Sequence, residues 1–266
     1  MKKKNGINSG QKTRQKSVAS CKKSDFLIKY FRTLFSVERG IAMILFTGDT
    51  HGEESRFYQI LAAQEKEWTE KDTLIVTGDF QYLFRDDFWE HKFLNELERK
   101  RYTICFCCGN HENFDALEGY ETETWNGGKV HRIRNNIYHL MRGQFFTIEG
   151  KKIFTFGGAH SIDWYMRKEH ISWWRQEMPC PQEYAEAREN LKRHGYVVDY
   201  IVTHTAPTEI IEALGFQPDP DEAELNGFLQ EIMRGVKYGE WFFGHWHRDA
   251  RVDDKHRAIW FDVEKR

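Results

Sequence analysis

The stretch Ile41-Ala-Met-Ile-Leu-Phe-Thr-Gly-Asp-Thr-His-Gly52 begins as an apolar run and ends with two potential metal ligands between glycines. The apolar part is typical of a buried strand, and side chains two residues apart at a strand end point the same way. Asp49 and His51 can therefore hold one ion together at the carboxyl end of this strand. An Asp-x-His pair alone is a weak sign of a metal site, so the prediction depends on what recurs downstream.

Four more apolar runs are followed by residues that can bind a metal. The segments are Gly78-Asp79, Gly109-Asn-His-Glu112, His204 and Gly244-His-Trp-His247. Each has a simpler interpretation, such as a helix cap, a turn residue or a core histidine, but their repeated position at strand ends favours one site. The set contains no thiolate, which favours hard or borderline divalent ions. Two neighbouring ions need a bridging ligand, and Asp79 is the natural candidate.

The rhythm of the chain predicts an α/β fold. Strand patterns at 41–46, 73–77 and 102–107 alternate with helical spacing at 53–70 and about 87–100, which indicates a parallel sheet. Ligands of such sheets gather beyond the carboxyl ends of the strands, where all the metal-type residues lie. Further strands are predicted at 136–140, 144–149, 152–156, 197–203, 240–243, 248–252 and 256–262, helices at 182–194 and about 221–233, and an irregular segment at 157–181. We expect one domain over residues 41–266 with an insert in its middle.

Composition excludes several classes of protein. Of the 266 residues 40% are hydrophobic and 30% charged, which is ordinary for a globular domain. No apolar run approaches the roughly 20 residues that span a bilayer. Cys105, Cys107 and Cys108 crowd one predicted strand, and we interpret them as small core residues, the first two on one face and the third on the other. Without a disulfide framework, a reducing compartment is expected, and we predict a cytoplasmic protein.

The first 40 residues differ from the rest. They hold eleven Lys or Arg against Asp25 and Glu38, a net charge of +9, which leaves −11 for residues 41–266. We expect residues 1–40 to form a basic, disordered extension. Three origins stay open: upstream sequence that is not translated, with Met43 as the start; a tail that binds anionic surfaces; or a targeting peptide. The first is favoured, because the fold needs nothing before Ile41.

Taken together, the five motifs resemble the signature of the calcineurin-like metallophosphoesterases, over roughly residues 43–262. The order is Asp-x-His, Gly-Asp, Gly-Asn-His-[Glu/Asp], His and Gly-His-x-His. The resemblance implies a four-layer α/β/β/α sandwich with mixed sheets and a site for two divalent ions, Mn²⁺ first, with Fe, Zn or Ni as alternatives. One ion would be held by Asp49, His51, Asp79 and His247, and the other by Asp79, Asn110, His204 and His245.

The resemblance also implies a hydrolase of phosphate monoesters or diesters. A hydroxide activated by the metals attacks phosphorus, and His111 assists the leaving group. Ser/Thr protein phosphatases of this superfamily carry a phosphate-binding Arg soon after Gly-Asp, and Gly78-Asp-Phe-Gln-Tyr-Leu-Phe-Arg-Asp86 lacks it at that place, which puts protein phosphatase activity in doubt. The segment 157–167 resembles a motif of small bacterial and phage-type members. Its Arg167 is a candidate phosphate clamp together with Asn110, the alternative being a solvated loop arginine.

Two further functions compete with hydrolysis of a small or otherwise phosphorylated substrate. A non-catalytic interaction scaffold on the same fold is disfavoured, because no ligand of the signature is missing. Nucleic-acid processing with the basic N-terminus as an electrostatic arm is disfavoured by the acidic body, and deletion of residues 1–42 with a binding assay would decide. The sequence does not determine the substrate, the choice between mono- and diester, the native metals or the oligomeric state.

Overall fold

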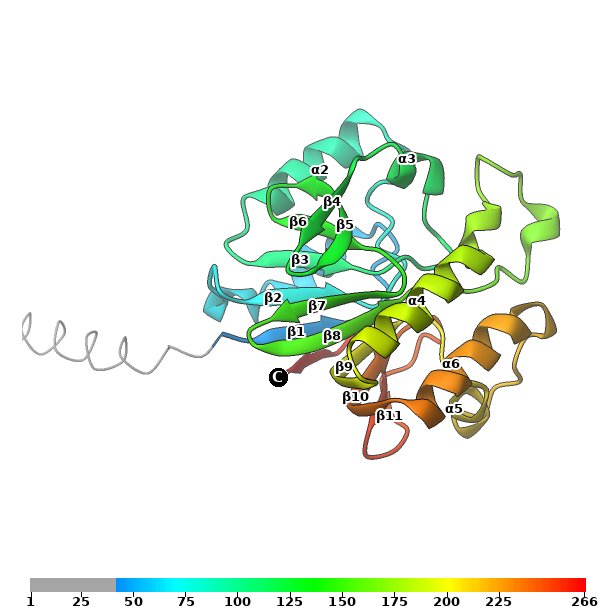
Figure 1. The fold of residues 1–266 in the computed structure, drawn as a ribbon. Helices are drawn as coiled ribbons and strands as arrows, with labels where there is room; N and C mark the ends of the chain where they lie inside the picture. Colours follow the sequence, from blue (N-terminus) through cyan, green and yellow to red (C-terminus); the bar gives the residue numbers. More distant parts are fainter. Residues whose placement is uncertain (1–41) are drawn as a thin grey trace, which may run out of the picture. The chain divides into compact units, whose positions relative to one another are not determined.

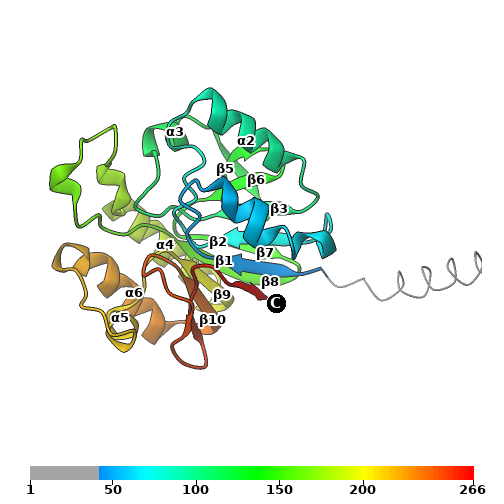
Figure 2. The same cartoon turned by 180° about the vertical axis from the view of Figure 1, so that it is seen from behind.

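The computed structural model describes residues 42–266 of the chain. These residues form two β-sheets that are stacked face to face, with helices on both outer sides (Figures 1 and 2). The expectations for residues 1–40 lie outside this part. The α/β fold with four layers and mixed sheets that the sequence predicts is confirmed. None of the helices described combines the length and the apolar character that crossing a membrane requires.

The first sheet has seven strands in the order β13-β1-β2-β3-β6-β5-β4. Strands β1, β2, β3 and β6 are parallel, whereas β13, β5 and β4 pair antiparallel. The bounds are β1 Ile44–Thr47, β2 Thr73–Val76, β3 Thr103–Phe106, β4 Thr122–Trp125, β5 Gly128–Arg134, β6 Ile137–Leu140 and β13 Val263–Lys265.

The second sheet has six strands in the order β11-β12-β10-β9-β8-β7. Its four inner strands are parallel, and β11 and β7 close the two edges antiparallel. The bounds are β7 Gln144–Ile148, β8 Lys151–Phe156, β9 Val197–Thr203, β10 Lys237–Phe243, β11 Ala250–Arg251 and β12 His256–Ala258. Both sheets are therefore parallel at the centre, as the βα rhythm predicts, and antiparallel only where hairpins or the chain end add an edge strand.

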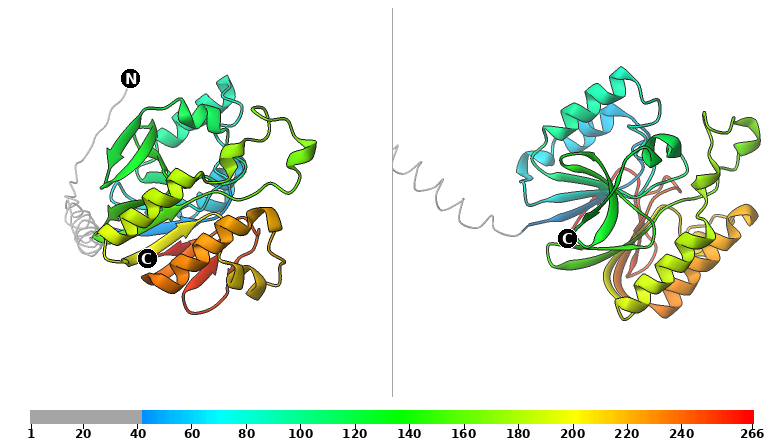
Figure 3. Two further views of the ribbon diagram at one scale, coloured as in Figure 1. Left: turned by 45° about the vertical axis from the view of Figure 1, so that its right-hand side comes forward. Right: turned by 45° about the horizontal axis from the view of Figure 1, so that its top comes forward.

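Helices cover the two outer faces (Figure 3). The first sheet packs against η1, α2 and α3, and the second against α4, α5 and α6. The bounds are η1 Arg56–Leu61, η2 Glu65–Glu67, α2 Phe88–Glu98, α3 Phe114–Glu118, η3 Trp164–Met166, η4 Arg175–Glu177, α4 Pro181–Arg193, α5 Thr208–Ala213, η5 Pro220–Glu222 and α6 Ala223–Gly235. The segment between β8 and α4 contains two short 3₁₀ turns and one isolated β-bridge, and it projects from the body of the domain (Figure 1).

Aromatic rings fill the space between the sheets. Phe46 of β1 stacks on Phe242 of β10 with ring centroids 3.9 Å apart. Cys105 and Cys107 belong to this inner core, whereas Cys108 belongs to the core under α2 and α3. The three cysteines are buried on opposite sides of the sheet, as predicted, although β3 ends at Phe106 and only Cys105 lies within it.

Some elements differ from the sequence prediction. The helix expected at 53–70 is a short π-helix (η1) followed by a 3₁₀ turn (η2), although Phe57, Leu61 and Trp68 are buried as the helical spacing indicates. The short helices α3 and α5 and the strands β4, β5 and β13 were not predicted, and the strand predicted at 256–262 ends at Ala258. Strand β4 lies at the sheet edge and buries no residue fully, so its sequence Thr-Glu-Thr-Trp carries no apolar signal.

Candidate metal centre

The carboxyl ends of strands from both sheets converge on one site. From the first sheet, Asp49 and His51 follow β1, Asp79 follows β2 and Asn110 follows β3. From the second sheet, the donors are His204 after β9 and His245 with His247 after β10. The structure thus brings together all seven residues that the sequence predicts as ligands.

One group of donors contains Asp49, His51 and His247. The Nε2 atom of His247 lies 3.3 Å from Oδ2 of Asp49 and 2.9 Å from Nε2 of His51. The Nδ1 atom of His51 lies 3.8 Å from Oδ2 of Asp79, which connects this group to the second one. The three residues can place one atom each within 4.8 Å of one another, as a shared ion requires.

The second group lies deeper. Oδ2 of Asp79 is 3.4 Å from Nε2 of His204, which is 3.0 Å from Oδ1 of Asn110. Nδ1 of His245 is 3.1 Å from the same amide oxygen. Asp49 also lies near His204, 3.9 Å from Nδ1. Asp79 therefore lies between the two groups, where a bridging ligand belongs.

The hydrogen-bond pattern of His204 leaves its Nε2 atom facing two oxygen atoms. Its Nδ1–H donates to the carbonyl of Thr77 at 2.8 Å, so in the neutral ring the Nε2 lone pair faces the oxygens of Asn110 and Asp79. Acceptors that face one another need a proton or a metal between them. Burial disfavours the charged ring, but the carboxylates of Asp79 and Asp49 outweigh it and raise the pKa of His204 to about 10. The donor set of oxygen and imidazole nitrogen fits two divalent ions.

Four of these residues have a left-handed backbone. The φ angles are 49° for His51, 49° for Asp79, 66° for His245 and 47° for His247. This region is uncommon for residues with a Cβ and is retained when the surrounding structure imposes it. The backbone is thus strained where the donors must turn toward a common point.

Two glycines of the motifs allow the backbone to pass close to the carboxylates. A Cβ at Gly109 would lie 2.0 Å from Oδ1 of Asp79, and a Cβ at Gly244 would lie 2.0 Å from Oδ1 of Asp49. No larger residue fits without displacing a donor. The glycines of Gly-Asn-His-Glu and Gly-His-x-His are therefore steric requirements of the site.

Glu112 supports the loop that follows Asp79. Its buried carboxylate accepts the backbone N–H groups of Phe80 at 2.8 Å and Gln81 at 3.1 Å. Burial, together with the charge of Asp79, raises the pKa of Glu112 to about 8. In the sequence, Glu112 is the last residue of the Gly-Asn-His-Glu motif, and its support of this loop is visible only in the structure.

His111 and Arg167 lie side by side at the mouth of the site. The backbone N–H of His111 donates to Oδ1 of Asp79 at 2.8 Å, and Nη1 of Arg167 lies 3.0 Å from Nδ1 of His111. Nε of Arg167 pairs with Asp163 at 2.8 Å. A guanidinium only donates, so Nδ1 of His111 accepts and the proton of the neutral ring is on Nε2. Burial is the main cause that lowers the pKa of His111 to about 4, with Asp79 opposing and Arg167 reinforcing the shift.

A cavity of about 510 Å³ opens onto this site. Besides predicted residues, its lining includes side chains that sequence reasoning missed, namely His160, Ser161, Ile162, Asp163, Phe216, Gln217, Asp219, Glu222 and Trp246. Ser161 accepts from Nδ2 of Asn110 at 3.0 Å, which orients the amide oxygen toward the histidines. In the sequence, the residues around Ser161 belong to the irregular segment 157–181 and to the motif-like stretch 157–167, but none of them was singled out. The residues around Phe216 had no such signal.

The sequence model of the family described as calcineurin-like phosphoesterase matches residues 42–249, and the chain belongs to this family. Members of this family are phosphoesterases that depend on two metal ions. The chain is also 26% identical, over 236 aligned residues, to a lariat debranching enzyme of Drosophila pseudoobscura pseudoobscura. The alignment covers 77% of this chain and 42% of that protein, so the chain spans about two fifths of the length of this curated relative.

A buried carboxylate anchors the end of the segment that carries Arg167. Glu177 is 1% exposed, and its Oε1 accepts the N–H of Trp174 at 3.3 Å. Its Oε2 has no hydrogen-bond partner among residues 42–266. Burial raises the pKa of Glu177 to about 7 from the ordinary 4.5.

This shift predicts a pH-dependent stability. At pH values between about 4.5 and about 7, Glu177 holds its proton in the folded chain but loses it in the unfolded chain. Its contribution to the free energy of unfolding therefore falls as the pH rises through this range and is constant above it. Relative to wild type, we expect Glu177→Gln to gain up to about 3 kcal/mol in free energy of unfolding between pH 5 and pH 8. Urea unfolding of both proteins with chelator present measures this, with exposed Glu189→Gln as the surface control. A difference that is constant across pH would contradict the assignment.

Proposed function

We propose that this chain hydrolyses phosphodiesters in preference to phosphomonoesters. The observation that supports this is the charge of the cavity wall. Besides Asp79, three carboxylates line the cavity, namely Asp163, Asp219 and Glu222, and Arg167 is the only Lys or Arg among the described residues of its lining. A monoester carries about −1.5 to −2 charges at neutral pH, whereas a diester carries one. The acidic wall therefore disfavours the monoester more strongly.

We assign the donors as the sequence predicts. Asp49, His51, Asp79 and His247 would hold one ion, and Asp79, Asn110, His204 and His245 the other, with Mn²⁺ as the first metal to test. When bound, two such ions would polarise the phosphoryl group and supply a hydroxide nucleophile at neutral pH. Asp79 is catalytic in this assignment, because it would serve both ions.

His111 would act as a neutral hydrogen-bond donor. Its pKa of about 4 keeps the ring uncharged at neutral pH, and Arg167 at Nδ1 leaves the proton on Nε2. An Nε2–H beside the cavity can stabilise the oxygen of the departing group and transfer its proton as that oxygen becomes basic. Asn110 and Arg167 would contact the phosphate oxygens on the same side.

The experiment compares two aryl esters. With Mn²⁺ added at pH 7.5, we expect kcat/KM for bis(p-nitrophenyl) phosphate to exceed that for p-nitrophenyl phosphate by about 10-fold or more, which corresponds to about 1.4 kcal/mol. Asp219→Asn should reduce this ratio by favouring the monoester, whereas Asp254→Asn at a fully exposed position should not change it. A preference for the monoester in the wild-type protein would refute the proposal.

Arg167 has a testable share in this activity. Replacing it by methionine keeps the length of the side chain but removes the donors, and hydrogen bonds to charged groups contribute about 1.5–3 kcal/mol. We therefore expect kcat/KM for the diester to fall roughly 10- to 100-fold. Lys168→Met, in the same loop but exposed, is the matched control. Equal activity of the two variants would show that Arg167 does not contact substrate.

A nucleic-acid diester is the second candidate substrate. Phe216 and Trp246 line the cavity with ring centroids 4.8 Å apart, and the guanidinium of Arg248 lies 5.2 Å from the Phe216 ring centroid. Aromatic and Arg side chains beside a phosphate site suit stacking with bases. The relative named above is a lariat debranching enzyme, which makes branched RNA the natural probe. Cleavage of linear and branched RNA oligonucleotides by the wild type and by Phe216→Ala tests this second candidate. The expectation from the sequence that the chain does not act on nucleic acid depends on the result.

A further inference from the structure

One histidine lines the cavity of the metal centre but belongs to neither group of donors. The Nδ1 atom of this residue, His160, lies 2.7 Å from Oδ2 of Asp219. An ionised carboxylate only accepts, so Nδ1 carries the proton, and in the neutral ring Nε2 carries the lone pair. Nε2 forms no hydrogen bond within residues 42–266 and is not among their fully buried unpaired atoms; 12% of the side chain is exposed. The cavity wall therefore contains an accessible hydrogen-bond acceptor.

The backbone of His160 is fixed as well as its ring. Its N–H donates to Oε2 of Glu222 at 2.8 Å, and Glu222 is 2% exposed. Oε1 of the same carboxylate accepts from Thr205 at 2.7 Å and from Asn226 at 2.6 Å, which connects His160 to the loop after β9 and to α6. A side chain whose orientation is already fixed loses little conformational entropy when a ligand binds.

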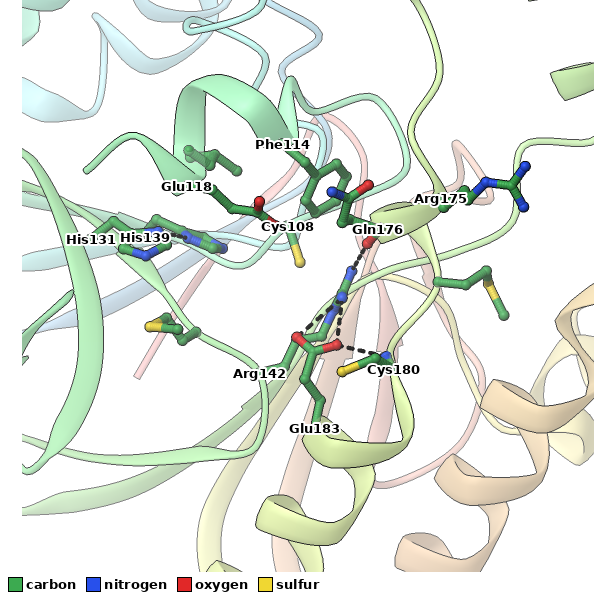
Figure 4. A pocket seen from close by; sticks show the side chains of 13 residues that line it. Cys108, Phe114, Glu118, His131, His139, Arg142, Arg175, Gln176, Cys180 and Glu183 are labelled. Atoms are coloured by element: carbon green, nitrogen blue, oxygen red, sulfur yellow. Dashed lines mark hydrogen bonds and ion pairs between the residues drawn. The ribbon is translucent and has the colours of Figure 1, made fainter. Parts of the chain in front are cut away.

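A buried arginine holds the segment that carries His160. Nε of Arg142 donates to the carbonyl of Gly157 at 2.9 Å, and Nη2 donates to the carbonyl of Gln176 at 2.7 Å. Figure 4 shows this guanidinium between Gln176 and Glu183, whose carboxylate accepts from Nη1 at 3.0 Å. Because Gly157 and Gln176 lie on either side of His160 in the chain, the path of the segment is set before any substrate binds.

The three carboxylates of the acidic wall are already engaged. Asp219 accepts from the ring of His160, and Glu222 accepts the three hydrogen bonds described above. Asp163 pairs with Nε of Arg167 at 2.8 Å. Within residues 42–266, Nε2 of His160 is thus an acceptor of this wall that has no partner of its own.

A lone pair at this position discriminates between groups on the substrate. The oxygens of an ionised phosphodiester only accept, so they gain nothing from Nε2, whereas a hydroxyl group can donate to it. A hydrogen bond between neutral groups contributes about 0.5–1.5 kcal/mol. We propose that His160 selects phosphodiesters whose alcohol part carries a further hydroxyl group, as esters of glycerol and ribose do. This inference rests on the diesterase function proposed above and names its class of substrate.

Turnover of matched p-nitrophenyl diesters tests the selection. The 3-hydroxypropyl and butyl esters have the same length and differ only in the terminal group. With Mn²⁺ added at pH 7.5, we expect kcat/KM of the wild type to be about fivefold higher for the hydroxypropyl ester. This ratio should fall to about 1 in His160→Leu and be retained in part in His160→Gln, because the glutamine amide oxygen can replace Nε2 as the acceptor. A ratio of about 1 in the wild type would overturn the inference.

A second histidine provides the matched control. His170 belongs to the same segment and pairs with Asp115 at 2.9 Å, but it does not line the cavity. His170→Leu should therefore keep the wild-type ratio, and loss of the ratio in this variant would overturn the assignment to His160. Melting temperatures of all variants show that each is folded.

Two further comparisons define the hydroxyl group. An ether only accepts, so the 3-methoxypropyl ester should show no advantage over the pentyl ester, and an advantage would mean that the ring donates, which contradicts the acceptor assignment. The p-nitrophenyl diesters of glycerol and of uridine (5′) are then compared with those of propanol and 2′,3′-dideoxyuridine. The pair with the larger ratio identifies the source of the hydroxyl group.

Calorimetry separates this inference from the diesterase proposal. The 3-hydroxypropyl and butyl monoesters of methylphosphonic acid each carry one charge, as a diester does, and have no good leaving group. We expect the Mn²⁺-loaded wild type to bind the hydroxypropyl ester about fivefold more tightly, and His160→Leu to bind both equally. Equal Kd values in the wild type, or no binding of either ester, would overturn the role of His160 even if diesters are hydrolysed. Preferential binding without turnover of any diester would refute the diesterase proposal and leave that role supported.

Discussion

Asp79→Asn is expected to lose metal and to turn over a phosphodiester about 10³-fold more slowly or worse, because bound metals supply several kcal/mol of transition-state stabilisation and each 1.4 kcal/mol is tenfold in rate. Oδ2 of Asp79 lies 3.4 Å from His204 and 3.8 Å from His51, and these histidines belong to the two donor groups. Asparagine keeps the shape and the acceptor for the N–H of His111 but removes the charge. Metal analysis after gel filtration and steady-state kinetics measure both effects.

A buried aspartate at the other end of the same strand provides the control. Asp72 accepts the N–H of Met43 at 2.7 Å and is 2% exposed, but it lies before β2 whereas Asp79 lies beyond its end. Asp72→Asn should lower stability and leave metal content near that of wild type. Mn²⁺ added back after chelation should restore wild type and Asp72→Asn but not Asp79→Asn. Full metal content in Asp79→Asn would remove this residue from the bridging role.

His111→Asn is expected to reduce turnover by at least about 10²-fold, the lower end for loss of a general acid, while metal content is intact. Arg167 donates to Nδ1 of His111 and so keeps the ring proton on Nε2. Asparagine cannot place a donor at that position. Because the pKa is about 4, the wild-type ring stays neutral above this pH. The pH–rate profile should therefore show no loss of activity between pH 6 and pH 8 that depends on His111.

The leaving group separates proton donation from a structural role. An alkyl leaving group needs the proton more than p-nitrophenolate does, so His111→Asn should affect methyl p-nitrophenyl phosphate less than a dialkyl ester. Equal losses for both substrates would indicate that the residue only orders the site. Loss of metal from His111→Asn would instead make His111 a ligand.

The donors could be predicted because each follows an apolar run. Asp49, Asp79 and Asn110 end neighbouring parallel strands, and the geometry of such sheets brings strand ends together without further information. The resemblance to the family then implied which donor holds which ion, and this assignment stays a proposal. Strand β4 could not be predicted, because an edge strand that buries no residue fully needs no apolar alternation.

Other features depend on contacts between segments with no periodic signal. The contact of Arg167 with His111 joins residues 56 positions apart through a segment of irregular path. The left-handed backbone at His51 and Asp79 is imposed by the folded surroundings and has no signature in the residue types. Arg142 reads as an ordinary loop arginine until the fold places four carbonyl and carboxylate partners around it.

The donors are divided between the two stacked sheets, with Asp49, Asp79 and Asn110 from one and His204 and His245 from the other. Ions bound among them would link the two layers. A ligand that binds only the folded state stabilises it by an amount that grows with the logarithm of the free ligand concentration relative to Kd. Storage in chelating buffers would then lower the stability of the sheet packing as well as abolish the proposed hydrolysis. Preparations purified with and without chelator should accordingly be compared at matched metal content.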